Sequence, residues 1–244
     1  MKPYPGPVNA SELRADPDRA VAAVHAGTVP YATAWDWQRE LVRRRAADEI
    51  GDVLLTLEHP RVYTLGRRAS RENVLLSDAE LAARGIETYD VDRGGDVTYH
   101  GPGQLVAYPI LRLRDPTSIV PYVRALEEVG IRTAASYGID AGRLDGFSGA
   151  WVGHDKLMAI GVRVTANHVT EHGLALNVTT HLDDFDGIVP CGITDKGVCS
   201  LASLGIDTTV DEAVVRLRRA WAEVFTTPVH DADVASLQLQ VRLA

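Results

Sequence analysis

The sequence lacks several features that would place it at once in a common class. It has only two cysteines, Cys191 and Cys199, too few for a disulfide framework, so we interpret both as reduced thiols. No apolar run approaches the roughly 18 residues of a membrane span. The first twenty residues contain no apolar core from which a secretory signal could be built. We therefore expect a cytoplasmic protein that does not enter a membrane.

Excess positive charge and nucleotide-binding motifs are missing as well. The formal net charge of -8 argues against general nucleic-acid binding, which needs a basic surface. There is no G-x-x-x-x-G-K-[ST] loop and no G-x-G-x-x-G at the start of a helix, so ATP-dependent chemistry has no support. The spacing of Cys191, Cys199 and His181 matches no familiar zinc pattern. We expect neither a metal nor a cofactor.

What is present indicates one α/β domain. The chain has 244 residues, of which 45% are hydrophobic, an ordinary composition for a globular protein of this size. Apolar residues recur at helical spacing over 31–50, from Pro121 to just before Gly138, and over 210–224. Capping boxes begin two helices, one with Ser77 and Glu80 and the other with Thr209 and Glu212.

Strand patterns lie between these helices. Short runs of strand length are predicted at 52–59, 62–65, 86–91 and 172–178, and a hairpin over 149–164 turns at 153–155. Its connections are too short for crossovers, so that part of the sheet must be antiparallel. We predict a single domain with a mixed, largely antiparallel sheet and flanking helices over residues 29–228. An irregular arm, 1–28, precedes it and a tail, 229–244, follows it.

Cys191 is the candidate nucleophile. It lies in IVPCGIT, after an apolar run and a proline and before a glycine, which leaves a neighbouring backbone N–H unobstructed. A thiol there can attack an acyl group once a base removes its proton. A free cysteine is also a common small buried hydrophobe. Cys199, in VCSLASLG, fits that second interpretation better.

Three residues are candidate bases. Lys156 opens the strand KLMAIGVRV, where partial desolvation would lower the pKa of its amine, although an ordinary hairpin lysine keeps its amine in water. His100 and His172 each precede a glycine and form the competing Cys/His pair, or bond to the backbone in turns. The glycine cluster at 94, 95, 101 and 103 forms turns or lets the backbone approach a ligand. Spacing alone leaves these alternatives open.

Five segments carry a resemblance to a known family. In order along residues 30–205 they are LEHPRVYTLGRR, RGGDVTYHGPGQLVAYPI, GAWVGHDKLMAIGVRV, HGLALNV and IVPCGIT. Together they resemble the octanoyl-carrier-protein:protein octanoyltransferases of lipoate biosynthesis, whose mixed α/β fold is related to biotin and lipoate protein ligases. The resemblance makes Cys191 the acyl-thioester cysteine and Lys156 its activating base. It implies substrate binding by three stretches: Arg93, Gly94, Gly95, Asp96, Val97, Thr98, Tyr99 and His100; Ala159, Ile160 and Gly161; His172, Gly173 and Leu174.

The resemblance also implies partners. Octanoyl would pass from acyl carrier protein to Cys191 and then to the lysine of apo lipoyl domains of 2-oxoacid dehydrogenase E2 and of the glycine-cleavage H protein, without ATP or metal. We expect Arg67, Arg68 and Arg71 to dock the acidic carrier. The alternatives are an ATP-dependent lipoate-protein ligase and a non-catalytic protein that binds carrier or lipoyl domains. Two positions depart from the family pattern: Asp96 stands where Lys or Gln is common, and Cys199 where Thr is usual.

Overall fold

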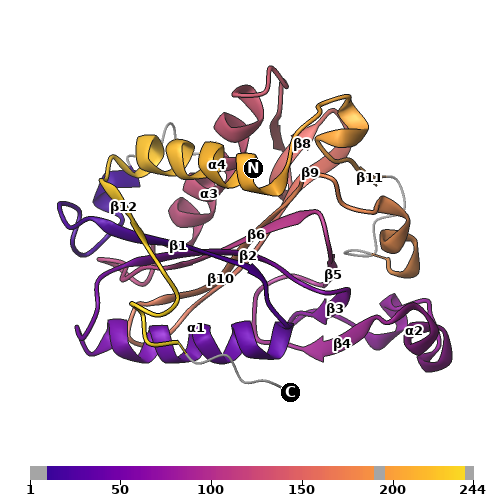
Figure 1. Ribbon diagram of the computed structural model, residues 1–244, viewed down its shortest axis with the longest axis horizontal. Coiled ribbons are helices and arrows are strands. Elements are labelled where there is room, and N and C mark those ends of the chain that lie inside the picture. The colour runs from indigo at the N-terminus through magenta and orange to yellow at the C-terminus, as the bar shows by residue number, and fades with distance from the viewer. Residues whose placement is uncertain (1–9, 190–195, 240–244) are drawn as a thin grey trace.

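The computed structural model describes residues 10–189 and 196–239, and its centre is a sheet of nine strands (Figure 1). Eight strands follow the order β12-β1-β2-β6-β10-β9-β8-β7, and β11 pairs with β9. Their bounds are β1 (Val21–Thr28), β2 (Val53–Glu58), β6 (Gln104–Ile110), β7 (Gly142–Leu144), β8 (Phe147–Val152), β9 (Asp155–Val164), β10 (Thr170–Asn177), β11 (Gly197–Val198) and β12 (Val229–Ala232).

Strand directions confirm the predicted mixed, largely antiparallel sheet. Neighbours from β2 through β6, β10, β9 and β8 to β7 are antiparallel. The β12–β1, β1–β2 and β11–β9 pairs are parallel. The β8–β9 hairpin turns where the sequence predicts, because Gly153 has the positive φ of 59° that a tight turn needs.

Helices cover both faces of this sheet. Figure 1 shows α1 (Tyr31–Ala46) below it and α3 (Ile119–Ala135) with α4 (Val210–Phe225) above it. The amphipathic pattern explains this arrangement, since α1 buries Ala34, Trp37 and Leu41 while α4 buries Leu217 and Trp221. Two separate apolar cores result, one on each face of the sheet. None of the helices in the described residues is long and apolar enough to cross a bilayer.

A small second sheet packs beside the first. It has the order β4-β3-β5, formed by β3 (Val62–Leu65), β4 (Glu87–Asp90) and β5 (Val97–His100). The short helix α2 (Asp78–Arg84) lies between β3 and β4 in the chain, with both capping-box bonds of Ser77 and Glu80 present and Gly85 ending the helix at φ 64°. A third apolar core, which includes Tyr63, Leu81 and Tyr99, supports this sheet. The glycine-rich segment 93–100 runs along it into β5.

The N-terminal region differs from the prediction. Residues 21–28 were expected in an irregular arm, but they form β1, an inner strand between β12 and β2. Its neighbour β12 lies within residues 229–244, which were expected to form a C-terminal tail. The sequence VAAVHAGT is rich in alanine, which is a weak strand former. Its pairing of Val21 with Val229 joins opposite ends of the chain, so no local pattern reveals it.

Charged side chains fasten this end of the sheet. Arg14 and Arg45, both fully buried, donate from Nε to the two carboxylate oxygens of Asp52, at 2.7 Å each. Arg14 Nη1 also donates to Thr227 Oγ1 at 2.5 Å. The arginine–aspartate cluster (Arg14, Arg45 and Asp52) therefore joins the chain before β1, helix α1, the start of β2 and the chain before β12.

Candidate active site

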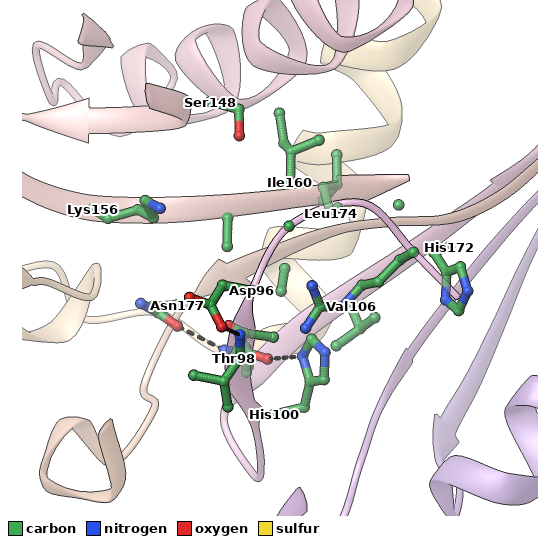
Figure 2. A pocket seen from close by; sticks show the side chains of 18 of the residues that line it. Asp96, Thr98, His100, Val106, Ser148, Lys156, Ile160, His172, Leu174 and Asn177 are labelled. Atoms are coloured by element: carbon green, nitrogen blue, oxygen red, sulfur yellow. Dashed lines mark hydrogen bonds between the residues drawn. The ribbon is translucent and has the colours of Figure 1, made fainter. Parts of the chain in front are cut away.

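A cavity of about 140 Å³ lies where the small sheet meets the main sheet (Figure 2). Its walls come from the glycine-rich segment and β5, from β6, β8, β9 and β10, and from the chain entering β11. A cavity of about 150 Å³ in another protein holds benzene, so this space suits a small organic group. Apolar side chains on three strands line it, among them Val106, Ile160 and Leu174.

Most of the predicted site residues meet at this cavity. Lys156 lines it, together with Arg93, Gly95, Asp96, Val97, Thr98, His100, Ala159, Ile160, Gly161, His172, Gly173 and Leu174. Gly94 and Tyr99 do not: the Gly94 N–H bonds to the Val162 carbonyl at 2.9 Å, and the Tyr99 hydroxyl donates to Asp184 Oδ2 at 2.7 Å. Three segments far apart in sequence therefore form one surface, as the resemblance implies.

Other lining residues were missed by the sequence analysis. They include Tyr31, Gln104, Ser148, Trp151, Asn177 and Lys196. Gln104, Trp151 and Asn177 stand inside the quoted motifs, so the motifs are the signal that could have found them. Tyr31 begins α1, and only packing of that helix against the sheet brings it to the cavity. No local pattern marks it.

Lys156 is held at the cavity by both of its strand neighbours. It is the second residue of β9, and its register partner on β8 is Trp151. The Lys156 amine lies 4.7 Å from the centroid of the Trp151 ring. On the other side, β11 pairs with β9, and the Cys199 N–H donates to the Lys156 carbonyl at 3.1 Å.

Cys191 lies outside the described residues. The chain after 190–195 lines the cavity, and the chain before it is linked to a cavity residue through Asn73. The Val189 N–H donates to the Asn73 carbonyl at 2.8 Å. The Asn73 side-chain amide donates to both carboxylate oxygens of Asp96, a cavity residue, at 3.0 and 2.9 Å. Lys196, Gly197 and Val198 line the cavity after the gap.

The other cysteine is a poor nucleophile. Cys199 is 4% exposed, and burial raises the pKa of its thiol to about 12. Its Sγ faces the Asp155 carbonyl oxygen at 3.7 Å. A thiol with that pKa is almost entirely protonated near neutral pH, so the structure supports its interpretation as a small buried residue.

His100 is a neutral histidine in a hydrogen-bonded chain. Burial lowers its pKa to about 3, so the ring is neutral. Because the Gln104 amide oxygen can only accept, Nδ1 carries the proton and donates to it at 2.7 Å. Gln104 Nε2 then donates to Asn177 Oδ1 at 2.9 Å, and Asn177 Nδ2 donates to the Cys199 carbonyl at 2.9 Å. A base of such low pKa is a weak acceptor for a thiol proton.

His172 is also buried and neutral. Burial lowers its pKa to about 4, outweighing the opposite effect of Asp92, whose Oδ1 accepts from Nε2 at 2.9 Å. Its backbone N–H donates to Gln38 Oε1 at 2.8 Å, which fixes α1 against β10. The low basicity of His172, like that of His100, makes Lys156 the stronger candidate base.

Asp92, Glu171 and His172 have the donor atoms and spacing of a possible metal site. Arg163 already supplies a cation there, because its Nη1 bonds to Asp92 and, at 2.9 Å, to Glu171 Oε2. A metal ion would have to displace this guanidinium and oppose its charge. We therefore interpret the group as an ion-pair network that holds β9, β10 and the chain before Arg93 together.

Two glycines let the backbones approach around the cavity. A Cβ on Gly173 would lie 2.0 Å from the Ala107 carbonyl oxygen, and one on Gly161 would lie 3.0 Å from Arg93 Cδ. Gly173 is therefore required for close packing of β10 on β6, whereas a Cβ at Gly161 would push the glycine-rich segment away from β9 by a few tenths of an ångström.

The predicted basic loop lies at the cavity's edge. Arg67, Arg68 and Arg71 are all exposed, and Arg68 lines the cavity. Arg71 is ion-paired with Asp78 at 2.8 Å. Arg67 and Arg68 are therefore the better candidates for contact with an acidic partner.

Comparisons with known proteins identify the family and the fold of this chain. Residues 30–222 match the family model described as the lipoyl protein ligase A/B catalytic domain. A curated octanoyltransferase of Chloroflexus aggregans is 50% identical over 211 residues, covering 85% of this chain and 96% of that protein. One from Acidobacterium capsulatum is 48% identical over 219 residues, with coverages of 83% and 89%.

Solved structures show the same fold at low sequence identity. A bi-partite lipoate protein ligase of Thermoplasma acidophilum aligns with a TM-score of 0.70 at 17% identity, over 89% of this chain and 90% of that one. A lipoate-protein ligase A bound with ATP aligns with a TM-score of 0.70 at 18% identity, over 90% and 92%. The expected likeness to lipoate ligases is confirmed. From the family match over most of its length and its close relatives, we conclude that this chain belongs to the lipoyl protein ligase A/B catalytic-domain family.

Proposed function

We propose that this protein is an octanoyltransferase that carries octanoyl as a thioester on Cys191, with Lys156 as the base. One observation carries the proposal most directly. Lys156 and all three predicted substrate-binding segments contribute to a single cavity, which is also lined by Lys196, Gly197 and Val198, the described residues that follow the segment holding Cys191. The names of relatives about 50% identical support the transfer of octanoyl.

The first half-reaction loads the enzyme. Lys156 Nζ takes the thiol proton of Cys191, and the thiolate attacks the carbonyl carbon of octanoyl thioester on the phosphopantetheine arm of acyl carrier protein. A new carbon–sulfur bond forms to Cys191 while the bond to the carrier sulfur breaks. The departing carrier thiolate takes the proton back from the Lys156 ammonium.

The second half-reaction passes the acyl group on. The lysine amine of an apo lipoyl domain, from a 2-oxoacid dehydrogenase or the glycine-cleavage H protein, attacks the thioester carbonyl. An amide bond forms, the bond to Cys191 breaks, and the proton lost by the amine returns to the Cys191 thiolate through Lys156. The thioester supplies the driving energy, so neither half-reaction consumes ATP.

The cavity suits an unbranched acyl chain. Val106, Ile160 and Leu174 supply apolar surface, and each buried methylene contributes about 0.8 kcal/mol. That increment gives a graded preference among neighbouring chain lengths rather than an absolute one. Glycines at 161 and 173 keep the backbone walls clear of side chains.

Intact-mass measurement tests the proposal. Purified protein mixed with octanoyl-acyl carrier protein, without ATP, should gain the mass of one octanoyl group, and peptide mapping should place it on Cys191. Hydroxylamine releases a thioester-linked acyl group rapidly. Cys191→Ser should lack this rapidly released adduct, whereas Cys199→Thr should retain it. An adduct on Cys199 would overturn the assignment. Lipoyl-domain modification only with free octanoate and ATP would favour a ligase, and binding without any acyl transfer would favour a non-catalytic protein.

A further inference from the structure

The β8–β9 hairpin places an aromatic ring beside the proposed base. Trp151 and Lys156 are register partners, with the register shifting between Ala150 and Trp151. Opposite residues of an antiparallel pair are close enough for their side chains to interact. The 4.7 Å separation of the Lys156 amine from the ring centroid is within the roughly 6 Å of a cation–π contact.

The position of this ring is fixed by its surroundings. Trp151 is 3% exposed and packs against Phe147, with ring centroids 5.9 Å apart. Gly149 has φ of 122°, and a Cβ there would lie 2.4 Å from the Met158 carbonyl oxygen and 3.5 Å from Trp151 Nε1. The indole therefore offers Lys156 a platform whose orientation is set by the hairpin itself.

Other charged groups line the same cavity. Asp155 precedes Lys156 in β9, and the remaining charged groups of the described cavity wall are Arg68, Arg93, Asp96 and Lys196. Cys199, across the β11 contact, is an uncharged thiol because burial raises its pKa. These groups include both signs. The ring differs from them because its attraction for the ammonium is directional and acts only over its face.

We propose that Trp151 is a positioning residue that holds the Lys156 amine over its indole face for proton exchange with the nucleophile. This inference rests on the proposed function. The proton moves from the thiol sulfur to Lys156 Nζ, which converts the amine to an ammonium ion. Because the ring attracts that cation, it stabilises the state in which the thiolate has formed and keeps the proton donor in place for the leaving group.

The first test measures the amine directly. In a Cys191→Ser background, which removes the coupled thiol, competitive labelling of Lys156 followed by peptide mass against pH gives its pKa. The ring favours the ammonium, so Trp151→Leu should lower this pKa by about one unit, and Trp151→Phe should lower it less. Trp35→Phe is the matched control: it removes an indole that lies under Arg39, at 4.9 Å, and should leave Lys156 unchanged.

The second test measures acyl-enzyme formation with Cys191 intact. Trp151→Leu should slow it about tenfold and Trp151→Phe less, with far-UV circular dichroism confirming the fold and Trp151→Phe serving if the leucine variant unfolds. An unchanged Lys156 pKa in both Trp151 variants overturns the contact. A shifted pKa with an unchanged acylation rate overturns the positioning role. Wild-type protein that forms no acyl-enzyme while the pKa still shifts overturns the transferase mechanism and the positioning role together.

Discussion

Two regions of the molecule bury polar groups in different ways. In the arginine–aspartate cluster, both oxygens of Asp52 accept from guanidinium groups, and Arg14 also donates to Thr227 and to the Arg19 carbonyl. At the cavity, two buried atoms of lining residues have no hydrogen-bond partner among the described residues, Trp151 Nε1 and His172 Nδ1. The polar groups of the cluster are therefore hydrogen-bonded to one another, whereas the cavity contains polar atoms that can still form hydrogen bonds.

The difference separates structural from chemical roles. Native proteins satisfy nearly all buried polar groups, so exceptions call for a ligand, a water molecule or a function. A satisfied ionic cluster fixes elements that meet from distant parts of the chain, and it offers nothing to a substrate. At the cavity, Trp151 Nε1 and His172 Nδ1 can still form hydrogen bonds. Damage to the cluster should therefore lower stability, and damage to the cavity should lower activity.

The largest effect on activity should come from Lys156. Lys156→Ala should cut the rate of acyl-enzyme formation by about 10² to 10⁴, the usual contribution of a positioned base, and leave the free energy of unfolding nearly unchanged. Lys156→Arg should fail almost as badly, because a guanidinium keeps its proton in this pH range. Time courses by intact mass and urea unfolding supply the two readouts. A wild-type rate in Lys156→Ala would return the role of base to His100 or His172.

The opposite result is expected at Asp52. Asp52→Ala leaves Arg14 and Arg45 buried without their shared carboxylate, so the free energy of unfolding should fall by about 3–5 kcal/mol. Activity per folded molecule should be retained. Asp48→Asn is the control, because Asp48 also bonds to Arg45 but is 59% exposed, and asparagine removes its charge while tolerating the φ of 58° at this position. Its cost should be small. If Asp48→Asn and Asp52→Ala lower the free energy of unfolding in urea equally, burial of Asp52 is not the reason for the large effect.

Below neutral pH, the buried histidines at and near the cavity should lower the free energy of unfolding, whereas the arginines of the arginine–aspartate cluster should not. Burial lowers the pKa of His59 to about 4, that of His100 to about 3 and that of His172 to about 4. The unfolded chain protonates these side chains near pH 6.5 while the folded chain does not, so their contribution to stability is present above that pH and is lost as pH falls toward 4. Each contributes a slope of up to about 1.4 kcal/mol per pH unit in this window.

Unfolding free energy measured by urea between pH 7 and pH 5 tests this expectation. The His59 side chain bonds to the Val29 carbonyl and to the Tyr108 hydroxyl. His59→Gln removes one titrating group and should therefore reduce the slope of unfolding free energy against pH. The arginines of the cluster do not titrate in this range. A pH-independent unfolding free energy over this interval would show that the buried histidines are charged or hydrated in the folded protein.

The smallest effect is expected at the cavity's rim. Replacing both Arg67 and Arg68 with Glu should slow acylation by acyl carrier protein by about tenfold at low salt and weaken its salt dependence, because an acidic carrier loses its attraction. A small octanoyl thioester should react at the wild-type rate. Arg219→Glu, on an arginine 84% exposed on α4, controls for the charge change. Equal losses with both donors would indicate damage to the cavity rather than to docking.

Much of the local structure could be predicted from the sequence. The helices α1, α3 and α4 follow from apolar spacing, and the capping boxes at Ser77 and Thr209 are formed as expected. The β8–β9 hairpin follows from strand patterns on either side of Gly153. Each depends on residues within a few positions of one another, so the physical cause is visible in a short window.

The candidate site was predictable to a smaller extent. The motif segments named most of the cavity wall, and Lys156 was found among them. Trp151 and Asn177 lie inside the motifs but were not named, because the motifs do not show which of their side chains point into the cavity. Tyr31 lies outside the motifs, and only its position in the folded protein identifies it. The role of Cys191 stays a prediction, since it lies outside the described residues.

The sequence by itself determined the local elements, the chemistry-bearing residues and, through its motifs, the family. Only the tertiary structure decided that β1 and β12 close one edge of the sheet, that Asp52 binds two arginines, and that Trp151 lies under the Lys156 amine. Strand pairing between Val21 and Val229 depends on bringing the two ends of the chain together, and many other partners compete for each strand. Packing of the whole chain selects among them, and that selection has no local signature.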